Sequence, residues 1–151
     1  MAEWCQWCQK WTKVFKWNDW QRTLEYIAKN PNIEEIILSG GEPLLLSDSK
    51  LENILRDISE LRREDGKPKV RFKRIHTRVM THNPYRVTDD FVRLLSQYRV
   101  NEIALNVAHP SEITEDVTEA IGKIRDCAGR YAPMIVTHTP LLRGINDSAE
   151  T

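Results

Sequence analysis

The stretch IEEIILSGGEPLLL, residues 33–46, decides the fold. Its apolar run 36–38 predicts a strand that is buried on both faces of a parallel sheet. Gly40 and Gly41 follow Ser39; without a Cβ they can adopt positive φ and let a ligand approach the backbone. Glu42 then places a carboxylate at the carboxyl end of the strand, and Pro43 stiffens the turn. Such a turn suits a small zwitterion such as an amino acid, and the alternative is a tight turn with a surface acid.

Composition narrows the function classes. The chain has 151 residues, which suits one domain. Lys plus Arg is 22 and Asp plus Glu is 22, so the zero net charge argues against a nucleic-acid or acidic-membrane surface. No stretch approaches the roughly 18 apolar residues of a membrane span, and no secretion signal is present. Three cysteines do not suggest a disulfide framework, so we expect a cytoplasmic protein.

The first 20 residues contain all five tryptophans and two of the three cysteines. The pair Cys5-Gln6-Trp7-Cys8 is compatible with half of a zinc site, a redox pair or part of an iron–sulfur ligand set. Zinc would need two further ligands, and neither Cys127 nor the histidines show a paired spacing. A thioredoxin-like redox pair would follow a strand, and none is predicted there. Core packing is the simplest explanation for most of the tryptophans.

The remaining chain predicts one helix, then three strand–helix pairs and a last strand. The strands are expected at 36–38, 70–75, 102–107 and 134–136. The helices are expected to start at four polar caps: Asn18 or Asp19, Ser47 or Asp48, Thr88, and Thr114. This alternation predicts an α/β fold of parallel strands with right-handed crossovers. We therefore treat residues 1–151 as a single domain.

Polar residues gather where the predicted strands end. They are Ser39 and Glu42, His76 and Arg78, Asn106 and His109, and His138. Each alone could be a surface loop residue. Ligands of α/β sheets and barrels bind at the carboxyl ends of the strands, so their joint placement predicts a site at that edge.

Five segments together resemble the lysine 2,3-aminomutase branch of the radical S-adenosylmethionine (radical SAM) superfamily. They are residues 5–8 (CQWC), 36–48 (IILSGGEPLLLSD), 74–79 (RIHTRV), 109–114 (HPSEIT) and 141–147 (LLRGIND). The resemblance implies a partial (β/α)6 TIM-like barrel of parallel strands. It also implies a [4Fe–4S] cluster, S-adenosyl-L-methionine, pyridoxal 5'-phosphate and an amino acid substrate.

The resemblance carries roles onto matching positions. Cys5 and Cys8 match two cluster ligands, because thiolates are the soft ligands that iron takes. The turn Ser39, Gly40, Gly41, Glu42 and Pro43 matches the segment that holds the methionine amino group of S-adenosylmethionine. His76 and Arg78 match strand-end residues that face the cofactor. Lys10 and Asp147 match substrate-binding positions for the carboxylate and the distal amine.

Three positions depart from the family pattern. The family spaces its cysteines C-x-x-x-C-x-x-C, and Met1 stands where the first would be. Lys10 replaces an arginine and lacks its two-pronged geometry. The family's pyridoxal-phosphate lysine would lie beyond Asp147, so we expect an incomplete radical SAM core.

Two hypotheses follow. The chain is an aminomutase-like enzyme core, or it is a non-catalytic remnant or binding module of the same fold without a working cluster. An incomplete barrel also leaves strand edges and apolar faces uncovered, which predicts a homo-oligomer.

Overall fold

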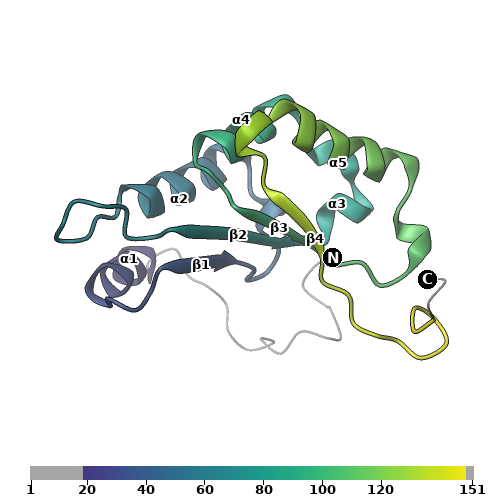
Figure 1. Ribbon diagram of the computed structural model, residues 1–151, viewed down its shortest axis with the longest axis horizontal. Coiled ribbons are helices and arrows are strands. Elements are labelled where there is room, and N and C mark those ends of the chain that lie inside the picture. The colour runs from purple at the N-terminus through teal and green to yellow at the C-terminus, as the bar shows by residue number, and fades with distance from the viewer. Residues whose placement is uncertain (1–18, 149–151) are drawn as a thin grey trace.

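A computed structural model describes residues 19–148, and its centre is a four-stranded sheet in which every strand pair is parallel (Figure 1). The strands are β1 (Glu35–Leu38), β2 (Phe72–Thr77), β3 (Glu102–Leu105) and β4 (Met134–Thr137). They lie in the order β1-β2-β3-β4, so each crossover adds the next neighbour. This arrangement confirms the predicted α/β class and fits a partial barrel. The sheet does not close within the described residues.

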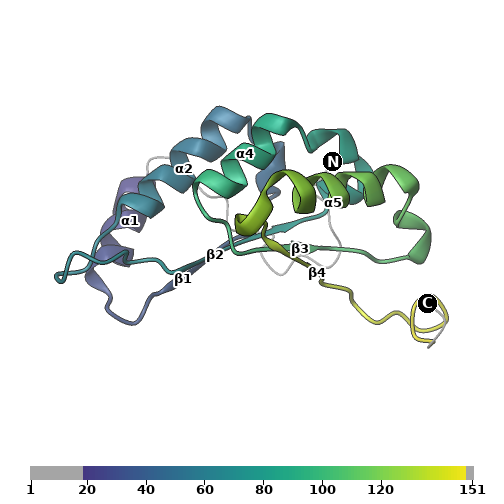
Figure 2. The ribbon, with the colours of Figure 1, turned by 45° about the horizontal axis from the view of Figure 1, so that its top comes forward.

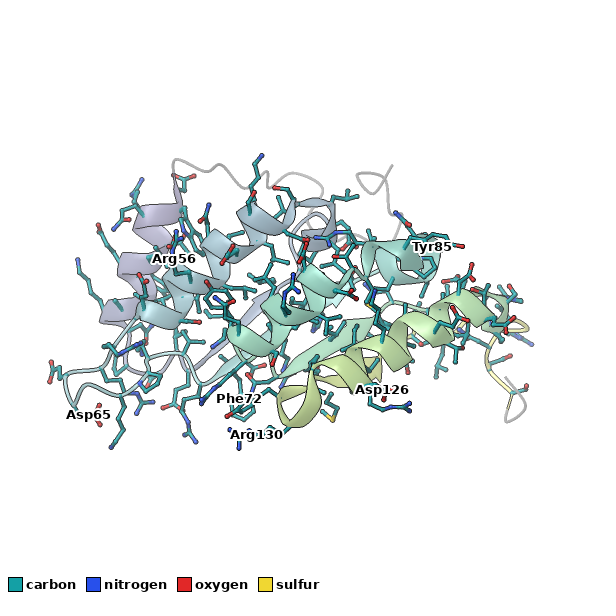
Figure 3. The ribbon with its side chains drawn as sticks, turned by 90° about the horizontal axis from the view of Figure 1, so that it is seen from above. Arg56, Asp65, Phe72, Tyr85, Asp126 and Arg130 are labelled. Carbon is teal, nitrogen blue, oxygen red and sulfur yellow. The ribbon has the colours of Figure 1, made fainter. Side chains whose placement is uncertain are left out.

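The helices lie on one face of this sheet (Figure 2). They are α1 (Trp20–Lys29), α2 (Asp48–Glu60), α3 (Val79–His82), α4 (Asp89–Gln97) and α5 (Glu115–Cys127). Figure 3 views this helix layer from above, with the labelled Tyr85 and Phe72 toward opposite ends of the sheet.

Side-chain caps start three of the helices as predicted. The Ser47 hydroxyl accepts a hydrogen bond from the Lys50 amide, and Thr88 and Thr114 cap α4 and α5 in the same way. Each such cap is typically worth about 1 kcal/mol. Asp19 stands at the cap of α1 but makes no side-chain cap bond.

The core lies between the sheet and the helices. Its largest fully buried side chains come from the strands, from helices α2 to α5, and from the turn after β1: Phe91, Leu44, Leu51, Leu55, Ile58, Ile75, Met80, Leu95, Ile103, Leu105, Ile124 and Val92. A smaller cluster joins α1 to α2 through Ile27, Ile54 and Ile58. Trp20 completes this contact, since its indole N–H donates to Asp57 at 2.8 Å.

Two strands, β2 and β3, differ from their predicted ranges by two residues, whereas β1 and β4 differ by one. β2 runs from Phe72 to Thr77 rather than from 70 to 75, because the amides of Arg71 and Phe72 both bond to the Glu34 carbonyl and only then does pairing start. β3 stops at Leu105 rather than at 107. Its neighbour β2 has already turned into the unpredicted helix α3, whose first amide donates to the Thr77 hydroxyl at 3.0 Å.

The face of the sheet opposite the helices is called the open face below. Because side chains alternate along a strand, it carries Ile37, Phe72, Arg74, Glu102 and Met134. Ile37, Phe72 and Met134 are 46%, 49% and 60% exposed. Arg74 links three strands there, with its guanidinium 2.6 Å from Glu35 and 3.8 Å from Glu102.

Among the described residues, no helix combines the length and apolar character needed to cross a membrane.

Candidate functional site

The turn after β1 leaves its glycine backbone open. Gly41 has φ +67°, a left-handed backbone conformation that favours glycine. Gly40 does not adopt a left-handed conformation. A Cβ at either position would meet no heavy atom within 4 Å. The fold therefore needs glycine at 41 for its backbone conformation. Nothing in the described structure needs it at 40. Ser39 lies half-buried before the pair, and Pro43 is buried at the start of a 3₁₀ turn, Pro43–Leu45.

The Glu42 carboxylate is held by three donors from two strand ends. Its Oε1 accepts from the Leu44 amide at 3.1 Å and from the Thr77 hydroxyl at 2.6 Å. Its Oε2 accepts from the Arg78 amide at 2.8 Å. Because each carboxylate oxygen has room for about two donors, Oε2 keeps one acceptor position. The carboxylate is thus oriented beside the glycine turn before any ligand arrives.

The Arg78 side chain ties the end of β2 to the segment after β3. Its Nε donates to His82 at 2.9 Å, and its Nη2 lies 3.2 Å from Glu112 Oε1. Glu112 sits in the 3₁₀ turn Pro110–Glu112, and its side chain is 16% exposed. Its second oxygen, Oε2, is buried and has no hydrogen-bond partner among the described residues. An unpaired buried acceptor costs about 1–3 kcal/mol, so it marks a position where a ligand donor would be favourable.

Two histidines meet at this edge. The rings of His76 on β2 and His138 just after β4 lie 5.5 Å apart in an edge-on arrangement. Burial, and then the nearby His138, lower the pKa of His76. The His76 Nε2 atom is buried and unpaired within the described part of the chain. At neutral pH this neutral ring offers an uncharged polar atom to the site.

His109 plays a local part. Its Nδ1 accepts from the Ser111 amide at 3.1 Å and so caps the 3₁₀ turn that presents Glu112.

The segment 140–147 folds back onto the exit of β3. Asn146 holds it there: its amide group donates to the carbonyls of Ala108 at 2.9 Å and Pro140 at 3.0 Å, and its Oδ1 accepts from Leu142 at 2.7 Å. Asp147 is exposed, and its Oδ1 accepts from the Gly144 amide at 2.8 Å. The other oxygen of Asp147 faces no described partner in this loop.

The predicted site residues therefore divide into two groups. The structure brings Glu42 into contact with the Arg78 amide, places His76 two residues before Arg78 on β2 and beside His138, and puts Asp147 on the loop attached to the β3 exit. Cys5, Cys8 and Lys10 lie outside residues 19–148. Within that range, no group of three or more His, Cys, Asp or Glu side chains could hold a metal ion.

Three residues of the site had no predicted role: Thr77, Glu112 and Asn146. Each lies inside a segment that the sequence singled out, next to His76, close to His109 or before Asp147. The sequence signal for these three residues was therefore only their position near residues that had been singled out. Their contacts reach residues 34 to 38 positions away, which no local pattern specifies.

One hollow in the described part of the chain lies elsewhere. It has a volume of about 390 Å3 and is lined by Tyr85, Asp89, Asp116 and Lys123 among others, but by none of the predicted site residues. Its charges are already paired, Tyr85 with Asp116 at 3.0 Å and Lys123 with Asp89 at 2.7 Å. This hollow has no orphaned polar group that would mark a ligand.

Comparison with known proteins shows which family the chain as a whole resembles. A family profile described as "Radical SAM superfamily" matches residues 3–150. L-lysine 2,3-aminomutase of Haemophilus influenzae is 33% identical over 132 residues, which cover 87% of this chain and 36% of that protein.

Two other relatives cover the same part of the chain. L-lysine 2,3-aminomutase of Methanococcus maripaludis is 37% identical over 127 residues, 84% of this chain and 27% of that protein. Glutamate 2,3-aminomutase of Clostridioides difficile is 33% identical over 127 residues, 84% of this chain and 28% of that protein. The chain thus spans about a third of the length of the curated relatives it matches, or less.

Proposed function

The chain belongs to the radical SAM superfamily, and from that membership we propose that its strand edge holds S-adenosylmethionine in an aminomutase-like enzyme. The family implies S-adenosylmethionine and a [4Fe–4S] cluster. When bound, these two groups supply one-electron chemistry that removes a hydrogen atom from a substrate. The protein's own task is to hold, orient and shield them.

The proposal rests mainly on the hydrogen bonding of the Glu42 carboxylate. Three donors fix its carboxylate, and one acceptor position on Oε2 remains beside an open glycine turn. A methionine ammonium placed there gains a charge-assisted hydrogen bond, typically worth about 1.5–3 kcal/mol. No reorganisation of the carboxylate is needed, because the bonds from β2 already orient it.

The other residues of the edge fit the same ligand. The buried, unpaired His76 Nε2 and Glu112 Oε2 are atoms whose hydrogen bonding is incomplete in the described structure. Hydroxyl and amine groups of S-adenosylmethionine would complete it. We assign Cys5 and Cys8 to the cluster on the chemistry of their thiolates alone.

For the substrate we propose an α-amino acid whose 2,3-amino migration the whole enzyme catalyses. The relatives named L-lysine and glutamate 2,3-aminomutase support this class. Lys10 would hold the carboxylate and Asp147 a distal amine. The use of pyridoxal 5'-phosphate and a cytoplasmic location stay predictions.

The proposal is tested by calorimetric titration of S-adenosylmethionine into chain reconstituted anaerobically with iron and sulfide. Gly40→Ala is the informative variant, since the added methyl meets no protein atom but stands where the ligand approaches. We expect wild-type chain to bind and Gly40→Ala to bind roughly tenfold more weakly or worse, with an unchanged unfolding midpoint.

Gly122→Ala in α5 is the matched control, because a methyl there also meets no atom within 4 Å. It should leave binding intact. With Met1→Cys supplying the third thiolate, reconstituted iron should give a broad charge-transfer absorbance that Cys8→Ala loses and Cys127→Ala keeps. Absence of wild-type binding, or equal affinity of the two glycine variants, would refute the proposed site.

A further inference from the structure

Arg86, at the end of the 3₁₀ turn Pro84–Arg86, reaches back to the 3₁₀ turn Pro43–Leu45 and to Leu46 after it. Its Nε donates to the Leu44 carbonyl at 3.0 Å and its Nη2 to the Leu46 carbonyl at 3.1 Å. The same Nη2 lies 2.6 Å from Asp48 Oδ1, an ion pair rather than a well-directed hydrogen bond. The Arg86 side chain is 16% exposed.

An aromatic ring fixes the plane of this guanidinium. Arg86 Cζ lies 4.9 Å from the centroid of Phe91, which is fully buried at the start of α4. A planar group stacked on a ring and forked onto two carbonyls has one orientation, which a lysine ammonium cannot reproduce. Arg86 therefore joins the β2–α4 connection to the start of α2.

Leu44 links Arg86 to the site. The Leu44 side chain is 1% exposed, so its peptide cannot move without disturbing the core. The Leu44 carbonyl accepts from Arg86, and the Leu44 amide donates to Glu42 Oε1. The Leu44 backbone is thus bonded to Arg86 through its carbonyl and to Glu42 through its amide.

We infer that Arg86 is a positioning residue that orients the Glu42 carboxylate through Leu44. It touches neither the glycine turn nor the ligand position. Without its fork, the 3₁₀ turn Pro43–Leu45 keeps its buried Leu44 side chain but loses its hydrogen bonds to the β2–α4 connection, which weakens the hold of the Leu44 amide on Glu42 Oε1. The consequence for S-adenosylmethionine rests on the proposed function, whereas the consequence for Glu42 does not.

The test uses Arg86→Lys in the full chain, with amide hydrogen exchange as the first measurement. Lysine keeps the charge beside Asp48 but loses the fork and the stacking. The Leu44 and Arg78 amides both donate to Glu42, and the Arg78 amide does not bond to Arg86. We expect both amides to exchange roughly tenfold faster, while Ile75 and Ile103 in the sheet centre keep their protection.

Arg93→Lys is the control, because that arginine is 73% exposed and pairs with Asp90 on its own helix. It should change neither amide. The second measurement is calorimetric titration of S-adenosylmethionine, in which Arg86→Lys should bind several-fold more weakly than Arg93→Lys.

Three outcomes would overturn the inference. The Arg78 amide could keep its protection, which would confine Arg86 to its own turn. All amides, including Ile75 and Ile103, could exchange faster together, which would make Arg86 a general stabilising residue. Leu44 could remain unchanged. If wild-type chain binds no S-adenosylmethionine, the proposed function fails, and the exchange measurement still decides the role of Arg86.

Discussion

At the scale of single residues, folding makes His76 of the candidate site harder to protonate. Burial disfavours the imidazolium, and the neighbouring His138 adds repulsion, so both lower the pKa of His76. In the unfolded chain the ring would titrate near its ordinary value of about 6.5. As the pH falls below that value, the unfolded chain takes up a proton that the folded chain still refuses.

Stability should therefore fall with decreasing pH from about 6.5 down to the lowered pKa of His76, and change no further through this group below it. His76→Gln keeps a polar side chain without a titrating proton. We expect it to reduce the slope of unfolding free energy against pH between pH 7 and 5, measured by urea unfolding at a series of pH values. An identical slope in both proteins would contradict the lowered pKa.

At the scale of elements, the sequence predicted what local chemistry specifies. The caps Ser47, Thr88 and Thr114 were correct, because a hydroxyl three residues before an amide needs no distant partner. The positive φ of Gly41 was anticipated for the same reason. Short apolar runs identified three of the strands, and alternation of apolar and basic residues identified β2.

The orientation of β2 could not be predicted in this way. Phe72 lies on the open face, while Lys73 is 8% exposed on the side of the helices. The Lys73 amide bonds to the Asn101 side chain at 2.8 Å, and burial lowers the pKa of its ammonium. A long aliphatic stem can cover apolar surface, so a lysine is a weak guide to which face is buried.

The hydrogen-bond partners of Glu42 could not be predicted from the neighbouring sequence either. The carboxylate was predicted at the right place, at the end of β1. Its bonds to Thr77 and Arg78 depend on the register in which β1 pairs with β2, with Leu38 opposite Ile75. That register is a property of the assembled sheet, and Arg86 gave no sequence signal at all.

The loop 140–147 offers a test at the same scale. The Asn146 side chain makes three hydrogen bonds, one to Ala108 at the β3 exit and two within the loop, to Pro140 and Leu142, and Arg143 is exposed in the same loop. We expect Asn146→Ala to speed tryptic cleavage after Arg143 several-fold, because each lost bond is worth about 1 kcal/mol. The unfolding midpoint should change little, since the loop packs no core side chain.

Asn32→Ala is the control for this measurement, at an exposed position in the turn before β1. It should leave cleavage at Arg143 unchanged. Equal cleavage rates in the two variants would show that the Asn146 bonds do not order the loop.

At the scale of the whole molecule, the open face is the feature with the largest consequence. Parallel sheets are ordinarily buried on both faces, yet Ile37, Phe72 and Met134 are substantially exposed here. Apolar surface of this kind favours association. We expect the 151-residue chain to sediment as dimers or larger species in analytical ultracentrifugation.

Phe72→Lys should shift this distribution toward monomer, since it places a charge among the exposed apolar side chains of the open face. Tyr26→Lys is the matched control: Tyr26 is 64% exposed, but lies on α1, away from that face. A monodisperse monomer for wild-type chain, or an equal effect of both variants, would mean that the open face does not drive association.

The hydrogen bonds between Glu42 and the end of β2 also determine when the site forms during folding. The bonds of Glu42 to Thr77 and Arg78 close loops of 35 and 36 residues. A growing chain can form the glycine turn as soon as residue 43 is made, but the carboxylate has no fixed direction until α2 has folded and β2 has paired. Ligand competence therefore arises late, with completion of the first crossover. A kinetic refolding experiment followed by ligand capture would record that long-range step rather than the earlier formation of helices.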